Sequence, residues 1–248
     1  DSMSDLVLDW KGWLSEGSFY IHMVVYMVVR IAVNITMSVK PFYLIYVTDF
    51  EQSPDSPTPL PIALVPLVQY TCSLIFSLFF YKRMIDKFKN RFYPLVISVV
   101  VLTIGSVPFL FLDGNHKTTN WVVYVASCVQ GVGMAIMLNT ATSLISDVIG
   151  NNEQSSAFVY GAYSFADKVA NGILLFFITD LWLNDEHSDA IKYILGCTPI
   201  ICSIIACFFT YLGRKLYSHR LANLQGSLLE NPSGSLLKGE VKDDEGQK

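Results

Sequence analysis

Charged residues are scarce in this chain of 248 residues, because Lys, Arg, Asp and Glu together make up only 15% of it. An average soluble domain holds roughly 25%. Hydrophobic residues make up 52% of the chain, and its mean hydropathy is +0.42. This composition leaves too little polar surface for a water-soluble fold. The net charge of −4 is also too small to indicate a strongly charged partner, and we expect no nucleic-acid binding.

Motifs that carry enzyme chemistry are absent from the sequence as well. It contains no phosphate-binding loop, no G-x-S-x-G nucleophile elbow and no H-E-x-x-H zinc motif. The few histidines are scattered along the chain, at His22, His116, His187 and His219. We therefore predict that the protein is not an enzyme or an ATP-driven pump, and that it holds no metal and no cofactor.

The five cysteines form no C-x-x-C pair, and all of them lie inside apolar blocks. Free cysteine in such surroundings usually serves as a small buried hydrophobic residue. We predict that role for Cys72, Cys128, Cys197, Cys202 and Cys207.

What the chain does contain is a series of long apolar blocks. A helix needs about 20 residues to cross the ~30 Å hydrocarbon core of a bilayer, and six blocks reach that length. Open sheets cannot span lipid, because their edge amides have no partner there. We therefore predict an all-α membrane protein that lies in the lipid bilayer. The expected transmembrane helices cover residues 19–47, 60–81, 92–112, 121–148, 157–183 and 191–212.

These helices divide the chain into three parts. Residues 1–17 are expected to form a cytoplasmic lead-in, and residues 18–213 a bundle of six helices. Residues 214–248 are polar and rich in Gly and Ser, which is typical of a disordered tail.

Basic residues mark one side of the predicted bundle. Only Lys117 and Lys192 lie on the side where Asp and Glu gather. Because cytoplasmic loops carry an excess of Lys and Arg, this asymmetry predicts that both termini are cytoplasmic. The twelve basic residues on that side are Lys11, Lys82, Arg83, Lys87, Lys89, Arg91, Arg214, Lys215, Arg220, Lys238, Lys242 and Lys248.

Four polar side chains are expected deep in the membrane, on four different helices. Arg30 and Lys168 each lie about 16 Å from the cytoplasmic face, at 1.5 Å per residue. Gln69 and Gln130 lie about 14 Å from the opposite face. Intramembrane charges are costly and usually functional. We therefore predict that the four converge near the midplane, where secondary transporters bind their solutes.

Polar residues also recur at helical spacing, which places them on one face of each helix. Such stripes favour a polar cavity over contact with lipid. They comprise His22, Tyr26, Arg30, Asn34 and Ser38 on the first helix, Asn139, Ser143 and Asp147 on the fourth, and Tyr160, Ser164, Lys168 and Asn171 on the fifth.

Structural roles are the alternative for each of these residues. An intramembrane Arg or Lys can serve as a buried ion-pair partner, and amides or hydroxyls often join helices. Asp167 adjoins Lys168 in sequence, but neighbouring residues on a helix do not face each other. Lys40 is expected to reach for the outer face, and Lys40-Pro41 to interrupt the first helix.

Three stretches carry a family resemblance, GVGMAIMLNTATSLISDVIG (131–150), SSAFVYGAYSFADKVANG (155–172) and VNITMSVKPFYL (33–44). They resemble the closing helices of the major facilitator superfamily, within its sugar–cation (glycoside-pentoside-hexuronide) symporter branch. The resemblance is closer to the superfamily's domain-containing protein 12 group, described as cysteine importers of lysosomes and melanosomes. It implies that the six helices form the carboxy-terminal half-bundle of a twelve-helix transporter, whose amino-terminal half is missing here.

The resemblance also implies roles for particular residues. Lys168 matches a helix-eleven lysine that lies near solute and cation in the symporter branch. The segment YKRMIDKFKNR (81–91) resembles the superfamily's basic gating loop, with Asp86 and Lys87 in the acidic and basic positions, and Arg91 is assigned to the same loop. It departs from that loop at Lys82 and Lys89, where glycines are usual.

The predicted function is therefore secondary active transport of a small polar solute together with a coupling cation. Cysteine or a related amino acid is favoured as the solute, and a sugar moved with protons or sodium is the alternative. A non-transporting membrane scaffold is the alternative of another class. The resemblance implies a lysosomal or melanosomal location, with the plasma membrane as the alternative.

Overall fold

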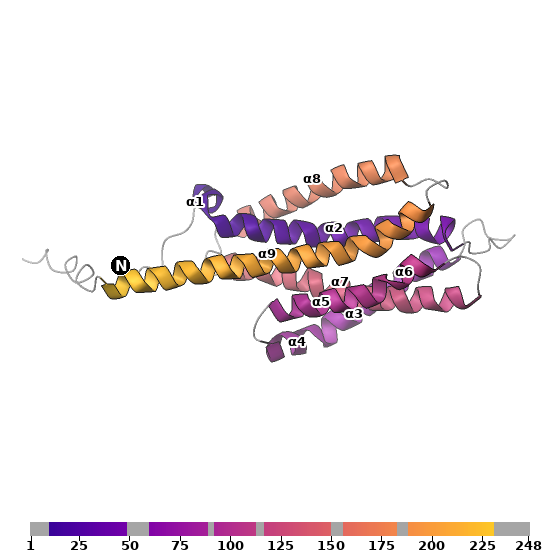
Figure 1. The fold of residues 1–248 in the computed structure, drawn as a ribbon, viewed down its shortest axis with the longest axis horizontal. Helices are drawn as coiled ribbons and strands as arrows, with labels where there is room; N and C mark the ends of the chain where they lie inside the picture. Colours follow the sequence, from indigo (N-terminus) through magenta and orange to yellow (C-terminus); the bar gives the residue numbers. More distant parts are fainter. Residues whose placement is uncertain are drawn as a thin grey trace, which may run out of the picture.

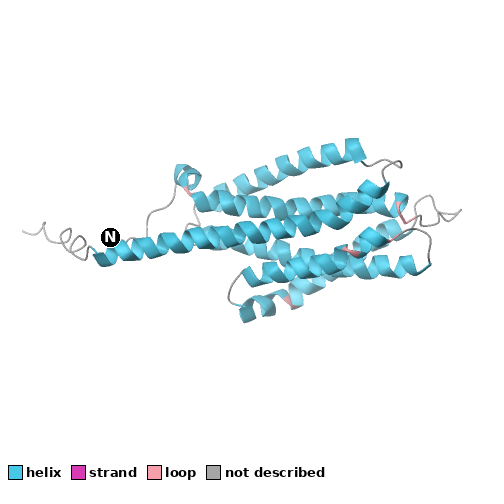
Figure 2. Ribbon diagram, viewed as in Figure 1, coloured by secondary structure: helices cyan, strands magenta, loops and turns pink. Residues whose placement is uncertain are grey.

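The structure is a computed structural model that describes residues 10–48, 60–88, 92–112, 117–149, 156–182 and 188–230. These residues are almost all helical, and none of them forms a strand (Figure 2). Five of the described helices are long and apolar enough to cross a membrane. The prediction of an all-α membrane fold is confirmed.

The long helices lie side by side and run alternately in opposite directions (Figure 1). A short helix, α1 (Trp10–Ser15), precedes the first of them, and α4 (Tyr81–Phe88) follows the second. The long helices are α2 (Gly17–Tyr46), α3 (Leu60–Phe79), α5 (Phe92–Ser106) with its continuation α6 (Pro108–Phe111), α7 (Lys117–Ile149), α8 (Ser156–Trp182) and α9 (Ser188–Glu230).

The helix breaks near two prolines differ from those that the sequence predicted. The predicted single helix over residues 92–112 is divided into α5 and α6, because Pro108 has no N–H to continue the hydrogen-bond ladder. The predicted interruption at Lys40-Pro41 is wrong, since α2 continues through Pro41 to Tyr46. A transmembrane helix tolerates such a proline where neighbouring groups satisfy the freed backbone atoms.

The last helix is longer than the sequence indicated. Residues 214–230, predicted as part of a disordered tail, continue α9 without a break. Their sequence contains five leucines and two arginines, which favour helices, and Pro232 follows only after the helix ends. The remainder of the predicted tail, residues 231–248, lies outside the described residues.

Packing between the helices is uneven. α9 lies along α2, and α7 packs against both α3 and α5. At the crossing of α5 and α7, a Cβ on Gly105 would lie 2.5 Å from the backbone nitrogen of Gln130. Such close helix approach through small residues is typical of membrane bundles. α8 contacts mainly α2 and forms the outermost helix of the bundle in Figure 1.

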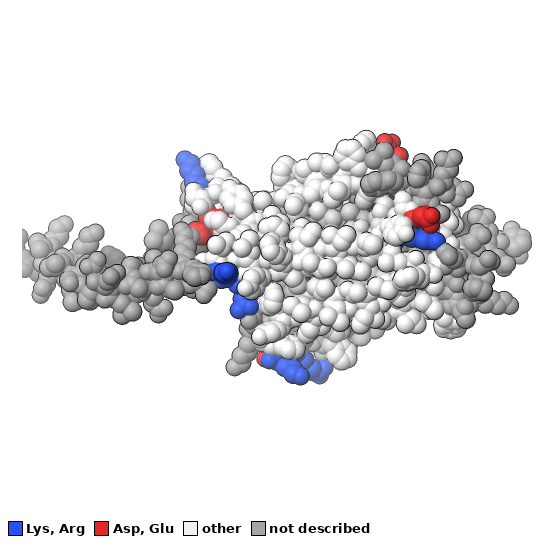
Figure 3. Space-filling model, viewed as in Figure 1, with Lys and Arg blue, Asp and Glu red and all other residues white. Residues whose placement is uncertain are grey.

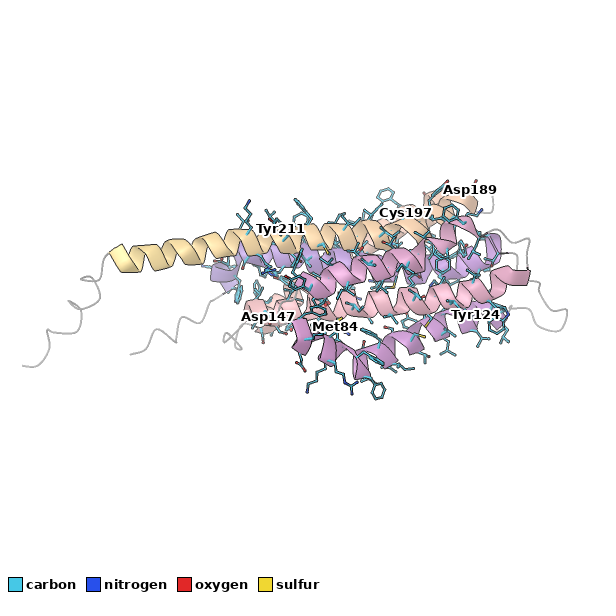
Figure 4. All side chains as sticks on the ribbon, turned by 60° about the horizontal axis from the view of Figure 1, so that its bottom comes forward. Met84, Tyr124, Asp147, Asp189, Cys197 and Tyr211 are labelled. Atoms are coloured by element: carbon cyan, nitrogen blue, oxygen red, sulfur yellow. The ribbon has the colours of Figure 1, made fainter. Side chains whose placement is uncertain are left out.

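Charged side chains lie at the ends of the bundle. On the face drawn in Figure 3 they gather at the two ends of the helices, and a broad uncharged band lies between them. Figure 4 places Met84 and Asp147 toward one end, and Tyr124 and Asp189 toward the other. The uncharged band is the surface expected to meet hydrocarbon.

One of the six predicted transmembrane helices is less apolar than a membrane span requires. α8 has 27 residues, which is long enough, but it is not among the five helices that are apolar enough to cross a membrane unaided. Asp167, Lys168 and Asn171 lie near its middle and interrupt the apolar stretch that a span requires. α8 therefore needs polar partners at membrane depth.

Candidate functional site

A deep ion pair joins α2 to α8. Nε of Arg30 donates to Oδ2 of Asp167 at 3.3 Å. The Asp167 side chain is 1% exposed, whereas that of Arg30 is 27% exposed. The side-chain amide of Asn171 donates to Oδ1 of Asp167 at 2.5 Å and to its backbone oxygen at 2.9 Å. The carboxylate is thus held from two sides, and one edge of the guanidinium stays open.

A second polar cluster surrounds the ammonium of Lys40, which is fully buried. Nζ of Lys40 donates to Oε1 of Gln69 on α3 and to Oε1 of Gln130 on α7, the latter at 2.7 Å. It also lies 3.4 Å from Oγ of Ser127 and 5.1 Å from the centre of the Phe109 ring. Nε2 of Gln130 in turn donates to Oγ of Ser106 on α5 at 3.0 Å. We call Lys40, Gln69, Gln130, Ser127 and Ser106 the Lys40 cage.

The Lys40 cage corrects two expectations. The prediction that Lys40 reaches the outer face is wrong, because neutral oxygens inside the bundle hold its ammonium. The predicted convergence of Gln69 and Gln130 with Arg30 is wrong too, since both amides bind Lys40. Arg30 and Lys40 are ten residues apart on α2, or about 15 Å along the axis. The bundle therefore holds two separate deep polar clusters.

Lys168 lies on the exposed face of α8, together with Tyr160 and Ser164. Among the described residues, none pairs with the ammonium of Lys168. The hydroxyl of Tyr160 lies 3.1 Å from Oγ of Ser146 on α7. Asn171, expected on the same face, is buried against Asp167 instead. A lysine in the middle of a membrane helix needs a polar surface or water opposite it.

The polar residues of α7 join helices. Nδ2 of Asn139 donates to Oγ of Ser77 on α3 at 2.9 Å, and Ser143 lies 3.3 Å from the hydroxyl of Tyr81. These contacts agree with the structural alternative for both residues. Asn34, one turn beyond Arg30 on α2, is only partly buried.

The expected gating loop is partly helical. Asp86 and Lys87 are exposed on α4, and Arg91 lies outside the described residues. Lys87 lies 6.0 Å from the centre of the Phe88 ring. The described part of this segment thus presents its charges to the surface, at the end of the bundle.

A cavity of about 230 Å³ opens among α2, α7 and α9 at the end where α2 begins. Its lining includes an imidazole, a carboxylate and a guanidinium. Nδ1 of His22 lies 2.8 Å from the backbone oxygen of Ser18. Groups of both charge signs could hold a small zwitterion here. The lining residues are Ser18, His22, Asp147, Val148, Gly213 and Arg214.

Two residues with central roles were not selected from the sequence. Asp167 was considered only as a neighbour of Lys168, although it is the partner of Arg30. Its position one helical turn before Asn171 was the available signal, because residues four apart share a face. Lys40 could have been recognised by its proximity in sequence to Thr36 and Tyr43, which are buried on the same helix.

Two buried polar atoms have no hydrogen-bond partner among the described residues. They are Oγ1 of Thr36 on α2 and Oδ1 of Asn171 on α8. The described residues also contain no group of three or more His, Cys, Asp or Glu side chains placed to hold a metal ion.

Comparison with known proteins agrees with this helical architecture. Residues 22–230 match the profile of the Major Facilitator Superfamily. The chain belongs to the major facilitator superfamily. No solved structure matches it significantly.

The chain is also similar to proteins named "Major facilitator superfamily domain-containing protein 12". It is 34% identical to the protein from Equus caballus and 33% identical to that from Homo sapiens, each over 175 residues. These matches cover 71% of this chain and 34% of each relative. The chain therefore spans about a third of the length of the curated relatives it matches, and the resemblance to their group is confirmed.

Proposed function

We propose that this chain is the carboxy-terminal six-helix half of a secondary active transporter for a small polar solute. The observation that carries the proposal is the exposed ammonium of Lys168 in the middle of α8. A charge facing hydrocarbon at that depth costs about 2.5–3.5 kcal/mol on insertion scales. The face with Tyr160, Ser164 and Lys168 therefore lines an aqueous route, opposite six further helices.

The open edge of Arg30 supports the same route. Arg30 is paired with Asp167 but remains 27% exposed, so part of its guanidinium can reach a solute. In alternating access, two bundles rock against each other around a shared site. We place Arg30, Asn34, Lys168 and Asn171 along this pathway, with Asp86, Lys87 and Arg91 in its gating segment. Gln69, Gln130, Asn139 and Ser143 support it from within the bundle.

The resemblance to the domain-containing protein 12 group favours cysteine or a related amino acid as the solute. Arg30 and Lys168, whose side chains are exposed at least in part, suit its carboxylate. The wider symporter branch favours a sugar moved with a proton or sodium, since a guanidinium can also bind hydroxyls. In this proposal both termini face the cytoplasm, and the membrane is lysosomal or melanosomal, with the plasma membrane as the alternative.

Uptake into vesicles that carry the full-length protein tests this proposal. Labelled cysteine should accumulate, and labelled disaccharide should not. Accumulation of the disaccharide alone would favour the sugar alternative. Transport of neither solute, nor of any related amino acid or sugar, would contradict the proposal.

The scaffold alternative is favoured by one observation, the pairing of Arg30 with Asp167. In a scaffold, the α8 face with Tyr160, Ser164 and Lys168 would be closed to water. The variant Ser164→Cys tests this, because Ser164 is exposed on that face. Phe165→Cys, 71% exposed beside it, is the matched control on a more apolar side. Labelling of both cysteines by a membrane-impermeant thiol reagent at equal, background rates would support the scaffold.

A further inference from the structure

The cavity among α2, α7 and α9 lies where water-soluble molecules can reach it. Asp147 on α7 and Arg214 on α9 both line it, and both are exposed. α7 has 33 residues and Asp147 lies in its last turn. At 1.5 Å per residue the helix is about 50 Å long, which exceeds the ~30 Å hydrocarbon core. Figure 4 likewise places Asp147 toward one end of the bundle, and charged side chains gather at the ends in Figure 3.

His22 of α2 supplies a hydrogen-bond acceptor to the same cavity. Its Nδ1 lies 2.8 Å from the backbone oxygen of Ser18. A carbonyl oxygen can only accept, so the proton of the neutral imidazole sits on Nδ1 and Nε2 keeps its lone pair. No described residue hydrogen-bonds to Nε2. This nitrogen is therefore available to an N–H donor.

Gly213 of α9 leaves space beside the imidazole. A Cβ on Gly213 would lie 3.9 Å from Cε1 of His22 and 3.1 Å from Cγ2 of Ile21. A larger side chain there would take up part of the cavity, which measures about 230 Å³. A water molecule occupies about 30 Å³, and pockets for drug-sized ligands begin at about 300 Å³. The cavity therefore suits a ligand that is larger than water and smaller than a drug.

We propose that this cavity is a binding site for a small zwitterionic amino acid. The guanidinium of Arg214 binds the carboxylate through two parallel N–H donors. Asp147 and Nε2 of His22 accept hydrogen bonds from the ammonium, and Val148 contacts the side chain. A simple anion would meet the charge of Asp147, and a simple cation would meet that of Arg214. The lining thus favours a ligand that carries both charges.

This site is separate from the route proposed along α8. His22 and Arg30 are eight residues apart on α2, or about 12 Å along its axis. Among the described residues that line the cavity, none comes from α8, the helix that carries Lys168. Binding in the cavity therefore does not depend on the proposed transport route.

Equilibrium binding of radiolabelled L-alanine to the full-length protein in phosphatidylcholine nanodiscs tests this site. Phosphatidylcholine is the suitable lipid because its quaternary ammonium has no N–H to donate to Asp147. Unlabelled alanine should displace the label. Ethylamine lacks the carboxylate and propionate lacks the ammonium, so each should displace it at least about tenfold more weakly, because each loses a charge-assisted hydrogen bond.

Variants locate the bound alanine. Arg214→Gln should weaken binding by about tenfold or more, because the amide cannot replace a charged pair of donors. Gly213→Leu should fill the cavity and abolish binding. Gly161→Leu is its matched control, since a Cβ at Gly161 meets nothing within 4 Å, and it should bind like wild type. Lys168→Ala should also bind like wild type. Arg214 is exposed, so its variant remains informative even where Gly213→Leu fails to fold.

Three results would overturn the proposal. The first is alanine binding that Arg214→Gln leaves unchanged; if Lys168→Ala removes that binding, the amino acid binds to the α8 face instead. The second is displacement by ethylamine or propionate as strong as that by alanine, since one charge would then suffice. The third is the absence of saturable alanine binding to the wild-type protein. Uptake into vesicles, measured separately, decides the transport proposal in each case.

Discussion

Gly131 of α7 lies so close to Gln69 of α3 that a Cβ atom on Gly131 would come within 2.4 Å of the Gln69 backbone oxygen. No real Cβ approaches a backbone atom so closely, so a larger residue must separate the two helices. The contact therefore sets the distance between α3 and α7, and with it the positions of both glutamines in the Lys40 cage.

Gly131→Ala should lower the melting temperature of the protein in detergent. Overpacking of a tight contact costs typically about 1–3 kcal/mol. Gly172→Ala is the matched control, since a Cβ at Gly172 meets nothing within 4 Å. The control should be neutral or slightly stabilising, because Ala is the better helix former. Equal melting temperatures for the two variants would contradict the close approach at Gly131.

Arg30→Gln should destabilise the protein more than the double variant Arg30→Gln/Asp167→Asn. The single change leaves the buried carboxylate of Asp167 without its cation, and breaking a buried pair costs about 3–5 kcal/mol. The double change removes the uncompensated charge and keeps polar side chains that can hydrogen-bond. Thermal unfolding of the two single variants and the double variant measures the coupling, and strictly additive losses would show that the pair is not energetically linked.

Lys168→Ala should abolish uptake per folded molecule and leave the melting temperature nearly unchanged. Lys168 is exposed and no described residue pairs with it, and surface substitutions usually change stability by within about 0.5 kcal/mol. Lys168→Arg should also transport poorly, because a planar guanidinium does not replace a compact ammonium. The control is Lys40→Ala, which leaves the cage amides unsatisfied and should reduce the folded yield first. Normal uptake by Lys168→Ala would remove Lys168 from the pathway.

Both chain ends should lie in the cytoplasm. The excess of Lys and Arg on that side predicts this orientation, and the alternation of the long helices is consistent with it. A glycosylation acceptor inserted at Gly114 should be modified in cells, and one inserted after Gly226 should not. Modification after Gly226 would reverse the topology.

The 248-residue chain on its own should insert into membranes without transporting solute. Transporters of this kind move one bundle against another around a shared site, and a single bundle leaves Lys168 facing no partner. Uptake measured on chains that sedimentation shows to be monomeric would contradict this expectation. Chemical crosslinking shows whether any uptake comes instead from two copies of the chain that pair in the membrane.

The helices of this fold could be predicted because each apolar block is long enough to cross the bilayer. The break at Pro108 was also predictable in principle, since proline cannot donate to the helix ladder. The positions of Arg30 and Lys168 near the middle of α2 and α8 followed from simple counting along the chain. What counting could not supply was the rotation of each helix about its axis.

That rotation decides which deep polar groups meet. It turns Asp167 toward α2 and its neighbour Lys168 away, although the two differ by one residue. It also brings Gln69 and Gln130 to Lys40 in place of Arg30. The rotation of each helix depends on close packing at small residues such as Gly105. Such contacts connect positions that are far apart in sequence.

The partners of α2 are synthesised long after α2 itself. Lys40 binds Gln69 and Gln130, which follow it by 29 and 90 residues, and Arg30 binds Asp167, which follows it by 137. During translation α2 therefore emerges with two cations whose counterparts do not yet exist. The contacts of Lys40 and Arg30 that hold α2 in the bundle therefore form only after α7 and α8 have been made.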